Sequence, residues 1–193
     1  PRQYARTQRL SLGEPRSFTV APDGSRVIFI RSHSGSDAVN TLWSLDTATG
    51  IERELLDPRT LNTDLSELTA AELRQRERAR EGASGVTSYA CNRDVSLAVT
   101  VLGGSVVLID LLNGDTKMPA IEPGVFDVRL SPDGTTISYL RETSLCISSL
   151  AGNERVLASD PSEAISWGNA EFIAAEEMGR MRGYWWSPDS QFI

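Results

Sequence analysis

The chain has 193 residues, 40% of them hydrophobic and 23% charged, a balance that excludes a disordered, a collagen-like or a membrane-embedded protein. Its formal net charge of −7 argues against a nucleic-acid-binding surface, because phosphate binding needs clustered, unpaired Lys and Arg side chains. No run reaches the ~18 apolar residues of a membrane span, and residues 1–6 lack the apolar segment of a signal peptide. Cys91 and Cys146 fit small buried side chains in a reducing compartment, so we expect a cytoplasmic protein with no membrane or nucleic-acid partner.

The first predicted unit is a four-stranded meander. Alternating apolar residues predict strands at 17–20, 26–30 and 41–46, followed by a more polar strand at 49–56. The segment Ala21-Pro22-Asp23-Gly24 joins the first two strands. In such a turn Pro presets φ near about −65°, the Asp side chain can accept a hydrogen bond from a following amide, and Gly tolerates a positive φ. These are hairpin turns and not phosphate-binding loops.

Residues 64–85 interrupt the repeat. Apolar side chains recur there at roughly helical spacing, at Leu65, Leu68, Ala71 and Leu73. The segment Thr69-Ala70-Ala71-Glu72 has the pattern of a capping box. A short helical insertion at about 64–85 is therefore predicted. Its Arg side chains are interleaved with Glu, which favours a solvated, salt-bridged helix over a basic recognition face.

Three further copies of the unit follow the insertion. A degenerate copy has its turn at 91–94 and strands at 97–102 and 106–110; the next has strands at 126–130, 136–140, 145–150 and 154–157; a last one begins at 184–190. Pro132 lies 39 residues after Arg93 and 56 before Pro188, spacings that bracket the ~40 to 50 residues of a propeller blade. We therefore predict an all-β fold, a partial β-propeller of about three four-stranded blades plus fragments, spanning 1–193 as one N-terminal propeller portion. Its terminal blades should each expose an apolar face.

The only histidine, His33, lies in the polar stretch 31–36, which predicts a loop position. A catalytic base needs an orienting acid and a nucleophile, and no G-x-S-x-G nucleophile elbow occurs in the sequence. We therefore expect no catalytic residue, no metal site and no cofactor within these residues.

The alternation breaks between the third and fourth copies, over residues 166–189. This stretch holds Trp167, an alternating apolar segment, the adjacent Glu176 and Glu177, and then Tyr184-Trp185-Trp186-Ser187-Pro188-Asp189. In that order these features resemble the double-glutamate motif of the dipeptidyl peptidase IV family, within the prolyl oligopeptidase superfamily of serine peptidases. Residues 68–78 and 85–89 are similar to an Arg/Glu-rich insertion of bacterial members, and 12–24 to the opening of actinobacterial ones.

The resemblance implies the larger setting and the role of the Glu pair. In that family a propeller caps an α/β-hydrolase domain with a Ser-Asp-His triad, and the enzyme releases dipeptides from peptide amino termini, usually after Pro or Ala. By resemblance, Glu176 and Glu177 bind the protonated amino terminus of the substrate. The implied partners are peptide substrates, a C-terminal hydrolase domain absent from this chain, and further copies in a homo-oligomer. The chain alone is then expected to be inactive. Relatives also use an arginine on the second blade, where residues 102–105 here contain none.

Other interpretations of these residues stay open. The Glu pair alone could be a solvated surface pair, and the repeat also fits a TolB-like or WD40-like propeller that binds proteins, or an endo-acting or acylaminoacyl oligopeptidase. Adjacent side chains on a strand point to opposite faces, so both carboxylates can converge only if 174–178 forms a helical turn or an irregular loop. Arg180 and Arg182 could orient the pair or be loop charges. The four tryptophans, at positions 43, 167, 185 and 186, are expected in blade cores or in packing between blades rather than as a ligand platform.

Overall fold

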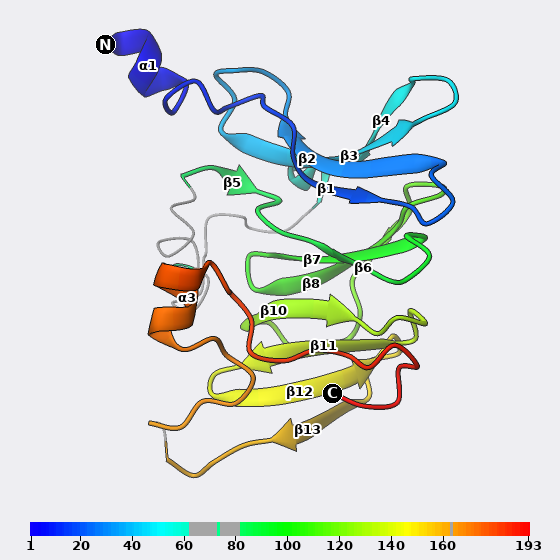
Figure 1. Cartoon of the computed structure of the whole chain (residues 1–193), viewed down its shortest axis with the longest axis vertical. Helices are drawn as coiled ribbons and strands as arrows, with labels where there is room; N and C mark the ends of the chain where they lie inside the picture. The colour runs from blue at the N-terminus through cyan, green and yellow to red at the C-terminus, as the bar shows by residue number, and fades with distance from the viewer. Residues whose placement is uncertain (62–72, 74–81, 163) are drawn as a thin grey trace.

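The computed structural model describes residues 1–61, 73, 82–162 and 164–193 (Figure 1). Three antiparallel sheets are stacked along the long axis of the molecule, each a meander whose strands follow the order of the chain. The first sheet contains β1 (Arg16–Val20), β2 (Arg26–Ser32), β3 (Val39–Asp46) and β4 (Glu52–Leu56), with the short β5 (Ser84–Gly85) parallel to β3. The second contains β6 (Ala90–Cys91), β7 (Leu97–Leu102), β8 (Ser105–Asp110) and β9 (Thr116–Lys117). The third contains β10 (Val125–Leu130), β11 (Thr136–Arg141), β12 (Ser144–Ser149) and β13 (Glu154–Ala158).

The helical elements that lie wholly within the described ranges are short: α1 (Arg2–Arg6), the 3-10 turn η1 (Pro58–Thr60) and α3 (Phe172–Met178). Within the described ranges, no helix is long and apolar enough to cross a membrane. The stack of four-stranded meanders is an all-β, propeller-like fold, as the repeat predicted.

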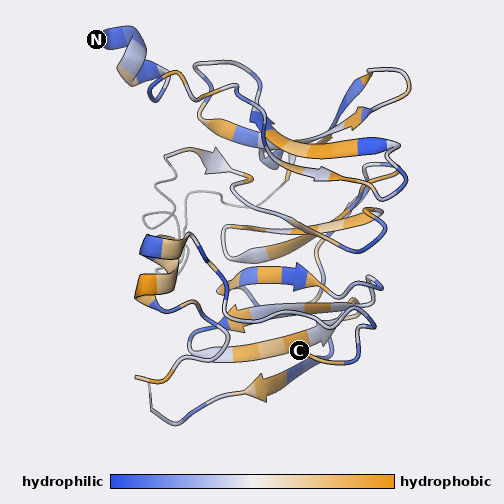
Figure 2. Cartoon of the chain, viewed as in Figure 1, coloured by the Kyte–Doolittle hydropathy of each residue, from blue (hydrophilic) through white to orange (hydrophobic). Residues whose placement is uncertain are grey.

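The middle sheet is buried on both faces, which explains its nearly continuous apolar sequence. Ala98 of β7 and Ile109 of β8 face the first sheet, where they share a core with Ile28 of β2. Their neighbours Val99 and Leu108 face the third sheet and belong to a second core, which includes Ile137 and Tyr139. Because side chains alternate along a strand, each of the two central strands contributes to both cores. Figure 2 shows the apolar residues gathered on the strands and the polar ones at the turns.

The predicted turn chemistry is confirmed. Asp23 Oδ1 accepts from the Ser25 amide at 3.0 Å, and Asp133 Oδ1 accepts from the Thr135 amide at 3.1 Å. Gly24 and Gly134 have φ values of 70° and 75°, which glycine adopts without strain. In the degenerate copy Val95 takes this position with φ 52° while its side chain is buried at 3% exposure. Burial in the first core therefore holds a β-branched residue in a conformation it normally avoids.

The first strands of two blades share an irregularity that the sequence repeat does not reveal. The β1–β2 register shifts between Arg16 and Thr19, and the β10–β11 register shifts between Phe126 and Arg129. Ser17 and Asp127 lie at equivalent places in these bulges with φ values of 55° and 47°. A bulge turns the strand locally and redirects a side chain. In the third blade this side chain is the carboxylate of Asp127.

Several expectations need correction or stay untested. The predicted insertion at 64–85 lies mostly outside the described residues, but its end, Ser84–Gly85, is the strand β5 and not helix. The fourth copy keeps its turn, with the Ser190 amide donating to the Ser187 carbonyl at 2.9 Å, but residues 184–193 contain no strand. The outer sheets are covered in part. The Arg31 guanidinium lies over Trp43 of the first sheet, and Tyr184 packs against the last.

Candidate functional site

The Glu pair lies on α3, a helix defined at both ends by its own sequence. Glu171 caps its start, with carboxylate oxygens that accept from the Ala174 amide at 2.6 Å and the Ile173 amide at 3.0 Å. Gly179, at φ 62°, ends it, and the Arg180 amide donates back to the Ala174 carbonyl at 2.9 Å. The stretch 174–178 is thus helical, which is the geometry that lets two adjacent carboxylates serve one ligand.

Small side chains hold α3 against the protein. Ala174 and Ala175 are buried, whereas Phe172, Glu176 and Glu177 are exposed. Successive helical residues differ by about 100° around the axis, instead of the 180° of a strand. Both carboxylates therefore stand on the solvent side of a helix whose inner face is methyl groups. In Figure 1, α3 projects from the flank of the stacked sheets.

Residues 169–182 form the excursion that carries α3, and backbone pairing closes this excursion at its base. Asn169 and Arg182 form an isolated antiparallel bridge, and the Gly183 amide donates to the Gly168 carbonyl at 2.9 Å. A Cβ on Gly183 would lie 2.5 Å from the Asn169 carbonyl oxygen, so only glycine fits at this crossing. The Trp167 amide donates to the Thr143 carbonyl at 2.8 Å, which attaches the excursion to the third sheet.

Below the excursion, the strand-like end of the motif is tied to the bulge of β10. The buried Tyr184 hydroxyl donates to the Asp127 carbonyl at 2.7 Å, and burial raises the pKa of that phenol. Trp186 Nε1 donates to Ser138 Oγ at 2.8 Å. The Asp127 carboxylate accepts from Arg129 at 2.6 Å, yet burial raises its pKa above the ordinary value despite this cation. Its second oxygen has no hydrogen-bond partner among the described residues.

Two of the four tryptophans are not buried in a blade core, in contrast to the prediction. Trp167 and Trp185 are about half exposed. Alternation explains Trp185, since its neighbours Tyr184 and Trp186 face the third sheet and it therefore points the other way. The Arg180 and Arg182 guanidinium carbons lie 5.9 and 5.2 Å from the centroid of the Trp185 ring. Trp185 is thus a platform for two cations, which the motif alone did not indicate.

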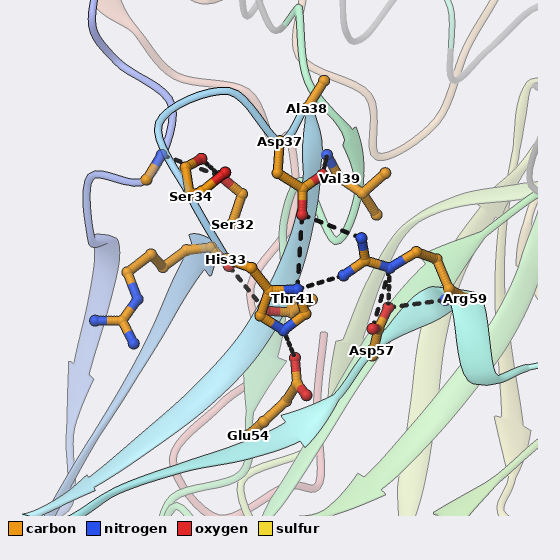
Figure 3. Close-up of polar contacts among 12 residues, drawn as sticks. Ser32, His33, Ser34, Asp37, Ala38, Val39, Thr41, Glu54, Asp57 and Arg59 are labelled. Atoms are coloured by element: carbon orange, nitrogen blue, oxygen red, sulfur yellow. Dashed lines mark hydrogen bonds and ion pairs between the residues drawn. The ribbon is translucent and has the colours of Figure 1, made fainter. Parts of the chain in front are cut away.

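His33 lies in the β2–β3 loop, as predicted, and is part of a charge network at the edge of the first sheet (Figure 3). Its Nε2 lies 2.7 Å from Glu54 Oε1, and its Nδ1 contacts the guanidinium of Arg59. Arg59 also donates to Asp57 Oδ1 at 2.9 Å and Asp37 Oδ2 at 3.1 Å. Because a guanidinium only donates, Nδ1 accepts and Nε2 carries the proton that is donated to Glu54. The β2–β3 connection, β4 and η1 are clipped together by this network.

Three residues of the same network have the spacing of a candidate metal centre. His33, Glu54 and Asp57 each offer one possible ligand atom, and these three atoms lie within 4.8 Å of one another. However, the Arg59 guanidinium already bonds to both His33 and Asp57, so these groups have a resident cation. Burial works to raise the pKa of Asp57, but the bonds and charge of Arg59 outweigh it and hold this pKa below the ordinary value. The geometry is that of a structural clip.

Comparison with known proteins finds a family whose model matches the second half of the chain. Residues 101–193 match the model of the family described as dipeptidyl peptidase IV (DPP IV) N-terminal region. Dipeptidyl peptidase 8 of Homo sapiens is 26% identical over 200 residues, covering 88% of this chain and 22% of the relative. The mouse protein of the same name is 26% identical over 204 residues, covering 91% of this chain and 23% of the relative.

Among solved structures, TolB from Acinetobacter baumannii aligns with a TM-score of 0.45 and 17% identity over 80% of this chain and 34% of the other. The chain spans about a fifth of the length of the dipeptidyl peptidase relatives. The region matched by the family model contains α3, its closed base and the Tyr184 anchor. Residues 101–193 of the chain are thus similar to the N-terminal propeller region of the dipeptidyl peptidase IV family.

Proposed function

We propose that this chain is the substrate-gating propeller portion of a serine peptidase that releases dipeptides from peptide amino termini. In this role Glu176 and Glu177 bind the protonated amine of the substrate. The observation that carries the proposal is the placement of both carboxylates on one short helix, capped by Glu171 and Gly179 and anchored by buried alanines. A hydrolase domain elsewhere in the protein would supply the triad.

The chemistry of the pair suits an ammonium group. Two carboxylates on adjacent helical residues repel each other unless a cation lies between them, and an ammonium has three donors to share between them. An anchor at the amine fixes how far the peptide chain extends toward the catalytic serine, and this distance sets cleavage after the second residue. An endopeptidase has no use for such an anchor.

The test is kinetic and uses the full-length protein that contains this chain. We expect Glu176→Gln and Glu177→Gln each to lower kcat/KM for an Ala-Pro chromogenic amide at least about thirtyfold, because each removes one partner of a charge pair. The N-acetylated amide should lose a similar factor in the wild type and little more in the variants, since its charge is already absent. Glu122→Gln, at another exposed glutamate, is the matched control. Near wild-type cleavage of the free-amine substrate by both variants would show that the pair is only a solvated turn.

A further inference from the structure

A pocket of about 390 Å³ lies next to the base of the α3 excursion. Three segments form it: the turn after β6, the end of β10, and the stretch that returns from α3. Its volume is in the lower part of the range of small-ligand sites. The lining residues are Ala90, Cys91, Asn92, Arg93, Arg129, Leu130, Pro132, Arg182, Trp185, Trp186 and Pro188.

Among the described residues, the lining of the pocket has three guanidinium groups and no carboxylate. Asp127 pairs with Arg129 from behind at 2.6 Å, but the Nε of Arg129 is buried and has no acceptor among the described residues. Neither Arg93 nor Arg182 makes an ion pair within the part of the chain that the structure describes. Asp189 is near Arg93, yet its Oδ1 is engaged by the Ser187 hydroxyl and the Gln191 amide of its own turn. The lining therefore has a surplus of positive charge.

The guanidinium groups of Arg129 and Arg182 lie close together although they repel each other. Burial lowers the pKa of Arg182, and the charge of Arg129 lowers it further, because these two guanidiniums repel each other in a partly dehydrated place. The Asp127 carboxylate attracts Arg182 and offsets only part of this effect. Trp185 keeps Arg182 there, with 5.2 Å between the guanidinium carbon and the ring centroid. An oxyanion between the arginines would relieve the repulsion through charge-assisted hydrogen bonds.

The rest of the lining favours an organic anion. Trp185 exposes about half of its surface, and the prolines Pro132 and Pro188 with Leu130 add apolar walls beside the guanidiniums. Guanidinium groups bind carboxylates through paired, parallel hydrogen bonds, and stacking on an indole keeps their planes in place. We propose that Arg93, Arg129 and Arg182, with Trp185, bind a carboxylate of a peptide ligand. The inference that this ligand is a peptide rests on the proposed function; the oxyanion site itself does not.

The experiment measures binding of N-acetylated pentapeptides to the 193-residue chain by calorimetry. One peptide has a single Glu and an amidated end, a second has Gln and a free carboxyl end, and a third has Gln and an amidated end. We expect the acidic peptides to bind at least about tenfold more tightly than the neutral one, because a charge-assisted hydrogen bond is stronger than a neutral one. The first two peptides distinguish a side-chain carboxylate from a terminal one.

Arg182→Gln should weaken binding of the preferred acidic peptide about tenfold or more. Arg93→Gln, at an exposed position that leaves the fold intact, should weaken it in the same direction. Arg180→Gln is the matched control, since Arg180 also lies over Trp185 but does not line the pocket. Equal affinity for acidic and neutral peptides, or affinities within twofold of wild type for both pocket variants, would overturn the proposal. Acetylated peptides lack the amine that the Glu pair is proposed to bind, so their binding tests the oxyanion site alone, and the two hypotheses can fail separately.

Discussion

The crossing at the base of α3 can be tested by adding one methyl group, in Gly183→Ala. The new Cβ would lie 2.5 and 2.8 Å from the carbonyl oxygen and carbon of Asn169 and 2.8 Å from the carbonyl oxygen of Gly168. These are backbone atoms, which cannot rotate aside as a side-chain end can. The methyl group must therefore push the two segments apart and strain the Asn169–Arg182 bridge.

Overpacking of this kind typically costs about 1 to 3 kcal/mol. For a chain of this length, each kcal/mol lowers Tm by about 2 to 4 °C, so a decrease of several degrees is expected in a thermal scan followed by circular dichroism. Gly35→Ala is the matched control, because its Cβ would meet only the Leu12 carbonyl oxygen at an ordinary 3.5 Å. If Gly183→Ala unfolds at the wild-type temperature, or if the two variants shift Tm equally, the crossing is not as tight as described.

Two further predictions concern the ends of α3 and the clip on the first sheet. Glu171→Ala removes the cap from two amides and should destabilise the helix by about 0.5 to 2 kcal/mol, seen as faster hydrogen exchange at Ile173 and Ala174. Arg59→Met should lower Tm at neutral pH, and the difference from the wild type should shrink as pH falls below 3.8, because the lowered pKa of Asp57 contributes its full stability only above that ordinary value and loses it as pH falls through the folded one. Unchanged exchange, or a Tm difference that does not shrink in acid, would contradict them.

The sequence predicted most of the sheet structure because period and turn chemistry both pointed to it. The strand at 26–30 became β2 (Arg26–Ser32), and that at 136–140 became β11 (Thr136–Arg141). Alternation predicts such strands, and the Pro-Asp-Gly turns fix their ends. The resemblance to the dipeptidyl peptidase IV family came from the order of features around the Glu pair, and the family-model match over 101–193 agrees with it.

The site was less accessible from sequence, because its geometry comes from contacts between segments far apart in the chain. The His33 network joins residues up to 26 positions apart, and no local pattern marks Arg59 as its centre. The pocket brings Arg93, Arg129 and Arg182 together across two sheets and a loop. The one local signal of this pocket is the pair of adjacent tryptophans, Trp185 and Trp186. Because side chains alternate along an extended segment, one of the two rings must face outward, and this ring is Trp185.

The order of strands also has a consequence for how the chain folds. Each of the three sheets is made from neighbouring strands of the chain, so most backbone pairing closes short loops and has a low entropic cost. Such a unit can form soon after its last strand is synthesised, before the next blade exists. The middle sheet is the exception, because both of its faces are apolar and need neighbours. The first sheet can therefore serve as the template on which the second is stabilised, so that folding proceeds blade by blade from the amino terminus.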